Sequence, residues 1–156
     1  MKVINTVDLE TKINLLERSI SKSDLINTTV SKVNVAWHID HSLKVINAVV
    51  KTMQNSDPKL YKDNFTFLGK ILLLLKYFPK GKAQAPKHVK PPEIILKSAI
   101  IDQLETAKQN LSEIVNLDEN AFFKHPLFGN INKKRVVRFL NVHTNHHLKI
   151  IKNILN

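Results

Sequence analysis

The sequence contains no cysteine. The protein therefore forms no disulfide bond and has no thiolate for zinc binding or for nucleophilic catalysis. The lack of cysteine also fits a reducing compartment such as the cytosol. Glycine and proline are scarce, at three and six residues in a chain of 156, which argues against a loop-rich β fold.

Long hydrophobic runs are absent as well. The most apolar stretch is I-L-L-L-L at residues 71–75, far below the roughly 20 residues that span a bilayer. The first ten residues, M-K-V-I-N-T-V-D-L-E, contain no apolar segment of signal-peptide length. We therefore expect a cytoplasmic protein that does not enter a membrane.

Arginine is rare although the chain is strongly basic, with a net charge of +11. Such a charge permits binding to nucleic acid or to anionic surfaces. Base recognition and bidentate phosphate contacts favour arginine, however, and the excess here is almost all lysine. We favour a solvated, lysine-rich surface over nucleic-acid binding. The candidate phosphate-binding cluster would be Lys124, Lys133, Lys134, Arg135 and Arg138.

A helical spacing of apolar residues runs through almost the whole chain, and no strand pattern is evident. An amphipathic helix is predicted around residues 9–20 and a second over residues 34–53, with Ser31 or Asn34 as its cap. Residues 65–77 predict a shorter, apolar crossover helix that is buried. Two more long helices are expected, one from about residue 93 and one that begins after the cap Asn132.

These elements predict an all-α fold, a four-helix bundle that forms a single domain over residues 1–156. The connection between the second and third long helices contains the short helix and a basic, proline-rich loop at residues 79–92. Long loops in compact domains are often functional. This loop could cover a site and bind an anion, or it could be a plain surface connection.

Histidine is the residue type that points to a specific chemistry. His143 and His147 are four residues apart, so they lie on one face of the last helix, within the same stripe as Leu140 and Ile151. His41 lies on the apolar face of the second helix. Three imidazoles would hold Zn²⁺, Ni²⁺ or Fe²⁺ and leave a position open for water or substrate. Buried histidines that merely hydrogen-bond to neighbours would give the same pattern.

The other four histidines receive weaker assignments. His38 is predicted to lie on a different face of the helix from His41. His125, in a turn before Pro126, has a structural role by default, and His88 in the basic loop has no obvious partner. His146 is expected either to support a ligand or to face solvent.

Three segments resemble those of a known family. They are V-N-V-A-W-H-I-D-H-S-L at Val33–Leu43, H-P-L-F-G at His125–Gly129 and H-T-N-H-H-L at His143–Leu148. These segments are similar to M-N-V-A-Q-M-L-A-H, H-P-x-F-G and H-x-x-H-H-L of the DinB-like (YfiT-like) superfamily. The closest resemblance is to a bacterial DinB-like family of unknown function, and it covers nearly the whole chain.

The resemblance implies a bundle of up-down-down-up topology with metal ligands at His41, His143 and His147. It also implies a metal-dependent transferase or hydrolase that acts on a small molecule, since characterised relatives include transferases and isomerases that use low-molecular-weight thiols. Trp37 and Ile150 replace residues that are glutamine in relatives, which makes the site more apolar. A non-catalytic basic bundle that binds nucleic acid, a scaffold with a vestigial site, and a homodimer remain alternatives.

Overall fold

The computed structural model describes residues 5–79 and 85–156 and is mostly helical. The long helices are α1 (Val7–Ser19), α2 (Val35–Gln54), α4 (Lys97–Asn116) and α5 (Lys133–Leu155). A short helix, α3 (Phe67–Leu74), and three single turns, η1 (Ile20–Lys22), η2 (Pro58–Leu60) and η3 (Lys87–Val89), complete the helical part. A two-stranded sheet consists of β1 (Phe122–His125) and β2 (Gly129–Asn132).

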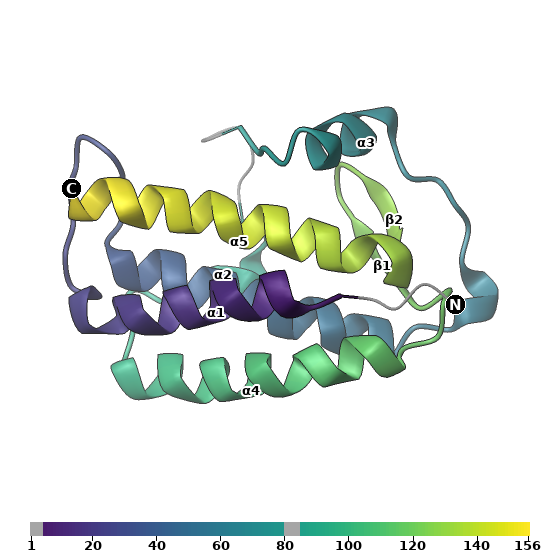
Figure 1. Cartoon of the computed structure of the whole chain (residues 1–156), viewed down its shortest axis with the longest axis horizontal. Helices are drawn as coiled ribbons and strands as arrows, with labels where there is room; N and C mark the ends of the chain where they lie inside the picture. The colour runs from purple at the N-terminus through teal and green to yellow at the C-terminus, as the bar shows by residue number, and fades with distance from the viewer. Residues whose placement is uncertain (1–4, 80–84) are drawn as a thin grey trace.

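The four long helices lie side by side along the long axis of the molecule, with α3 outside α5 (Figure 1). α2 packs against both α4 and α5, and α1 packs against the same two helices. Their apolar stripes meet in one core, where Ile13, Leu43, Ile100 and Leu140 are completely buried. The helical spacing of apolar residues therefore predicted the four long helices and the faces that they bury.

The helix boundaries agree closely with the sequence for the first two helices and less well afterwards. Asn34 caps α2, its side-chain oxygen accepting a hydrogen bond from the Trp37 amide at 3.0 Å. Asn132 stands at the start of α5, but its side chain makes no capping hydrogen bond there. α4 begins at Lys97 rather than near residue 93, with Leu96 in extended backbone immediately before it.

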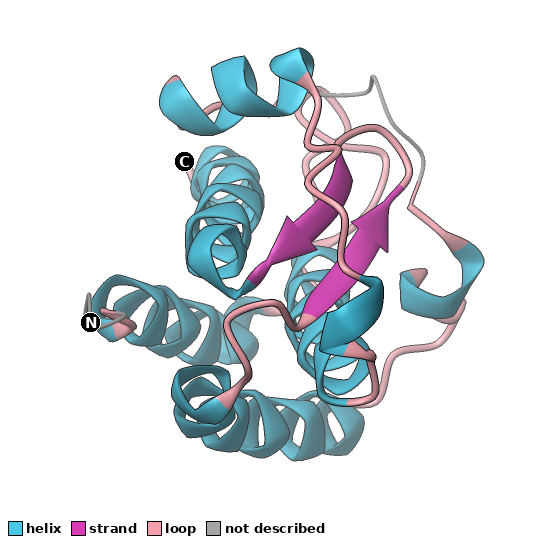
Figure 2. Ribbon diagram, turned by 90° about the vertical axis from the view of Figure 1, so that its right-hand side faces the viewer, coloured by secondary structure: helices cyan, strands magenta, loops and turns pink. Residues whose placement is uncertain are grey.

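The two-stranded sheet corrects the prediction that the chain has no strands. β1 and β2 pair antiparallel, and the H-P-L-F-G segment forms the turn between them. Gly129 adopts a φ of +77°, and a Cβ atom there would lie 2.4 Å from the Asn64 carbonyl oxygen, so only glycine fits. Figure 2, a view nearly along the long helices, shows the two strands beside the helices. Such short strands contain too few alternating residues to be recognised by period.

The short helix α3 corrects a second prediction, that the apolar segment after α2 is buried. Only Gly69 and Leu73 of α3 are buried, whereas Phe67, Leu68 and Leu74 are at least half exposed. A uniformly apolar sequence does not reveal which face a helix buries. None of the described helices combines the length and the apolar character needed to cross a membrane.

A polar seam joins α2 to α4 next to the predicted site. The buried Asp40 carboxylate accepts a hydrogen bond from Gln103 at 2.6 Å and forms a 2.7 Å salt bridge with Lys44. Two turns after Asp40, Asn47 donates a hydrogen bond to the Gln103 carbonyl and accepts one from Asn110. These contacts fix the rotation of α2, because a buried carboxylate is costly unless its partners are kept in place.

We therefore expect Asp40→Ala to lower the free energy of unfolding by about 1–3 kcal/mol, since it leaves Gln103 and Lys44 without their acceptor. Urea denaturation at pH 7 measures the change. Asp102→Ala on the exposed face of α4 is the matched control and should cost less than about 0.5 kcal/mol. Equal losses in the two variants would contradict the assigned role of the seam.

Candidate metal centre

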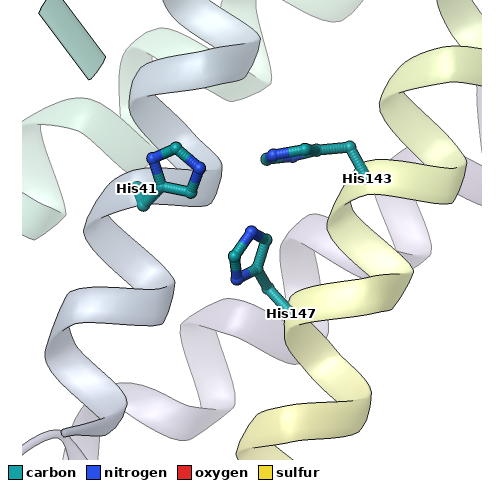
Figure 3. A group of neighbouring side chains, drawn as sticks. All are labelled: His41, His143 and His147. Atoms are coloured by element: carbon teal, nitrogen blue, oxygen red, sulfur yellow. The ribbon is translucent and has the colours of Figure 1, made fainter. Parts of the chain in front are cut away.

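The three histidines singled out in the sequence lie together in the structure. His41 comes from α2, and His143 and His147 come from successive turns of α5. One nitrogen of each ring lies within 4.8 Å of one nitrogen of each of the others. Figure 3 shows the three rings around a common gap, each with a nitrogen toward it. The i, i+4 spacing and the packing of α2 on α5 produce this arrangement.

His41 is held by a backbone carbonyl. Its Nδ1 atom lies 2.8 Å from the carbonyl oxygen of Val89, in the turn η3. Because a carbonyl oxygen only accepts, Nδ1 must carry the proton, and Nε2 keeps its lone pair. This partner arrangement is the usual one for a histidine that binds a metal through its other nitrogen.

His143 and His147 differ in their hydrogen bonding. The Nδ1 atom of His143 is buried and has no hydrogen-bond partner among the described residues. The Nδ1 atom of His147 lies 3.0 Å from Nδ1 of His38, which sequence reasoning had assigned to a different face. That assignment was wrong: His38 is buried and packs against α5 together with His41. A three-residue spacing puts both rings within a single wide face of α2.

All three imidazoles are kept neutral by their surroundings. Burial lowers the pKa of His41, although the Val89 hydrogen bond and the Asp40 charge oppose this shift. Burial lowers the pKa values of His143 and His147 much further, and the neighbouring histidines add to the effect. Neutral imidazole is the form that binds a metal, so the cluster is in its binding form at pH 7.

The donor set fits a divalent ion. Two nitrogens bound to one Zn²⁺ at about 2.1 Å in a tetrahedral arrangement lie about 3.4 Å apart, so nitrogens that now lie within 4.8 Å of one another need to approach by at most about 1.4 Å. The unpartnered Nδ1 of His143 and the bare Nε2 of His41 are the lone pairs that such an ion would bind. Phe78 and Phe139 border His143 and give that side an apolar wall.

The remaining histidines lie outside the cluster. His125 accepts hydrogen bonds from the amides of Leu127 and Phe128, both at 3.2 Å, and thereby stabilises the sheet turn. Burial lowers its pKa to about 4. His146 contacts the His147 ring edge-on, with ring centroids 5.0 Å apart, and His88 is exposed in η3.

The part of the basic loop that the structure describes adjoins the site. Residues 80–84 lie outside the described residues, but Val89 ends η3 and contributes the carbonyl that holds His41. Trp37 stacks on the other side of His41, with ring centroids 5.0 Å apart. The resemblance had placed Trp37 beside the site, whereas His38 is a site residue that sequence reasoning did not assign. The position of His38 one turn before His41 was the signal for it.

No protein-family model matches the chain, and no curated protein or solved structure matches it either.

The buried neutral histidines make stability depend on pH. Below pH 6.5 the unfolded chain takes up protons that the folded chain excludes, so the free energy of unfolding falls as the pH falls. We expect this loss between about pH 6.5 and pH 4 in metal-free protein, measured by urea denaturation in the presence of a chelator.

The variant His143→Leu removes one of the groups whose pKa is lowered, so its free energy of unfolding should change less steeply over that range. His88→Leu replaces an exposed histidine and is the control. Its free energy of unfolding should change with pH as steeply as that of the wild type. A wild-type stability that does not change between pH 6.5 and pH 4 would contradict the burial of these imidazoles.

Proposed function

We propose that the protein is a metal-binding member of the DinB-like superfamily whose divalent ion is held by His41, His143 and His147. The convergence of the three imidazoles from α2 and α5 on one gap carries this proposal. The expected up-down-down-up topology is part of it. Its support is the course of the chain in Figure 1, where α2 and α4 run one way and α1 and α5 the other.

The reaction that we propose is a metal-dependent transfer or hydrolysis on a small molecule. Zn²⁺, Ni²⁺ or Fe²⁺ bound by three histidines supplies a Lewis acid and lowers the pKa of a bound water or thiol. The chain's own contribution is to keep the three imidazoles neutral and oriented. The Val89 carbonyl orients His41, and the phenylalanine rings beside His143 exclude water from that side.

A hollow next to the histidine cluster supports an anionic small molecule as the substrate. Its volume is about 810 Å³, and Trp37 forms part of its wall while stacking on His41. Lys32, Lys87 and Lys90 also line it, together with two acidic residues, Asp24, which pairs with Lys97, and Glu93. No ion pair engages these three lysines within residues 5–79 and 85–156. The lining therefore has a small excess of positive charge, next to the Trp37 ring that stacks on His41.

The first test is the metal content of protein that was produced without a histidine tag. We expect one divalent ion per chain by mass spectrometry and by titration with Zn²⁺, Ni²⁺ or Fe²⁺. The double variant His143→Ala/His147→Ala should lose stoichiometric binding, because one histidine alone is a weak site. The control His88→Ala should bind like wild type; retention of metal by the double variant would refute the proposal.

The second test concerns the hollow and uses pyrophosphate as an anionic probe. Trp37 is the only tryptophan, so its fluorescence reports directly on this wall. We expect pyrophosphate to change that fluorescence. The affinity for pyrophosphate obtained from this titration should be at least about tenfold lower in the Lys32→Gln/Lys87→Gln/Lys90→Gln variant. The matched control replaces three exposed lysines elsewhere, Lys59, Lys149 and Lys152, with glutamine. Equal weakening in both variants would indicate nonspecific charge attraction.

The alternative of a basic bundle that binds nucleic acid has less support. Lys133 is buried, donates to the Leu117 carbonyl and pairs with Glu119, while Arg135 forms a bidentate pair with Asp63. Arg138 donates to the Leu73 carbonyl. Three of the cations expected to contact phosphates are thus committed to contacts within the protein. A vestigial site, a homodimer and a cytoplasmic location stay predictions.

A further inference from the structure

His38 is a buried histidine with a hydrogen-bond contact on each side of its ring. Its Nδ1 atom lies 3.0 Å from Nδ1 of His147, and its Nε2 atom lies 3.0 Å from the hydroxyl oxygen of Ser31. Ser31 precedes α2, and its hydroxyl also accepts the Val33 amide at 3.3 Å. A continuous chain of polar contacts therefore joins the candidate ligand His147 to the segment that leads into α2.

The direction of these hydrogen bonds decides whether the nitrogen of His147 that faces the gap has a free lone pair or carries a proton. A neutral imidazole carries one N–H, and two Nδ1 atoms at 3.0 Å require that one of them donates to the other. If His147 donates through Nδ1, its Nε2 atom is bare and faces the gap. His38 then carries its own proton on Nε2 and donates it to Ser31. In the opposite direction, His147 would carry its proton on Nε2 and could not bind a metal there.

We propose that His38 is a positioning residue that accepts a hydrogen bond from the Nδ1–H of His147 and so keeps Nε2 of His147 free as a ligand. This inference rests on the proposed metal site. The Val89 carbonyl has the corresponding role for His41. The two partners differ in one respect: a carbonyl fixes a single tautomer, whereas His38 accepts only while its own proton is on Nε2. In that form the Nε2–H of His38 donates to the hydroxyl oxygen of Ser31, 3.0 Å away.

A pair of variants separates the hydrogen bond from simple packing. In His38→Asn the Oδ1 atom takes the place of Nδ1 and still accepts, whereas His38→Leu fills space without an acceptor. We expect His38→Leu to bind Zn²⁺ about 10–100-fold more weakly than wild type, the usual effect of losing such a partner. His38→Asn should recover most of that affinity. Competition with a chromogenic chelator measures it.

The matched control is His146→Leu, because His146 also packs against the His147 ring, with ring centroids 5.0 Å apart compared with 5.3 Å for His38. Its zinc affinity should stay near that of wild type. Long-range ¹H–¹⁵N NMR of the zinc-loaded wild type gives a direct readout, in which His147 should be protonated on Nδ1 and His38 on Nε2. Circular dichroism establishes that each variant is folded.

Two results would overturn the inference while the proposed metal site stands. One is a folded His38→Leu variant that binds zinc as tightly as wild type. The other is a zinc-loaded wild type in which Nδ1 of His147 carries no proton. If His38→Leu does not fold, His38→Asn and the NMR readout decide the question. A wild type that binds no zinc refutes the proposed function itself, and the positioning role with it.

Discussion

The packing of α2 against α5 is the constraint on which the rest of the structure depends. It brings His38 and His41 opposite His147 and His143, and it removes all of these rings wholly or largely from water. Burial of so many imidazoles is tolerable only because they are neutral, and the lowered pKa values of His143 and His147 are its direct consequence. The same interface that completes the core thus creates a cluster of uncharged nitrogen donors.

Much of this arrangement could be predicted from the sequence. The apolar stripe of α5 includes His143 and His147, so their inward direction followed from helical geometry. The pairing with His41 did not follow from spacing, because periodicity does not say which helices face each other. It came from the resemblance of V-A-W-H-I-D-H-S to a family segment, and the structure places His41 opposite the other two independently of that resemblance.

The features that sequence reasoning missed depend on contacts between distant segments. The sheet turn is set by the close approach of Gly129 to Asn64, and α3 is exposed because only Gly69 and Leu73 turn inward. The Val89 carbonyl comes from a turn 48 residues after His41. The contact between His38 and His147 spans 109 residues. No local pattern encodes such contacts, since each depends on how whole elements pack.

The two sides of the site differ in how firmly they are held. His41 is oriented by a backbone carbonyl and by the stacked ring of Trp37, next to a seam in which Asp40 and Gln103 lock α2 to α4. His147 depends instead on a side chain that can donate or accept. His143 has an unpartnered Nδ1 atom and an apolar surround. A buried nitrogen without a partner is costly, and binding an ion is one way to remove that cost. The α2 side of the site is therefore held by more fixed contacts than the α5 side.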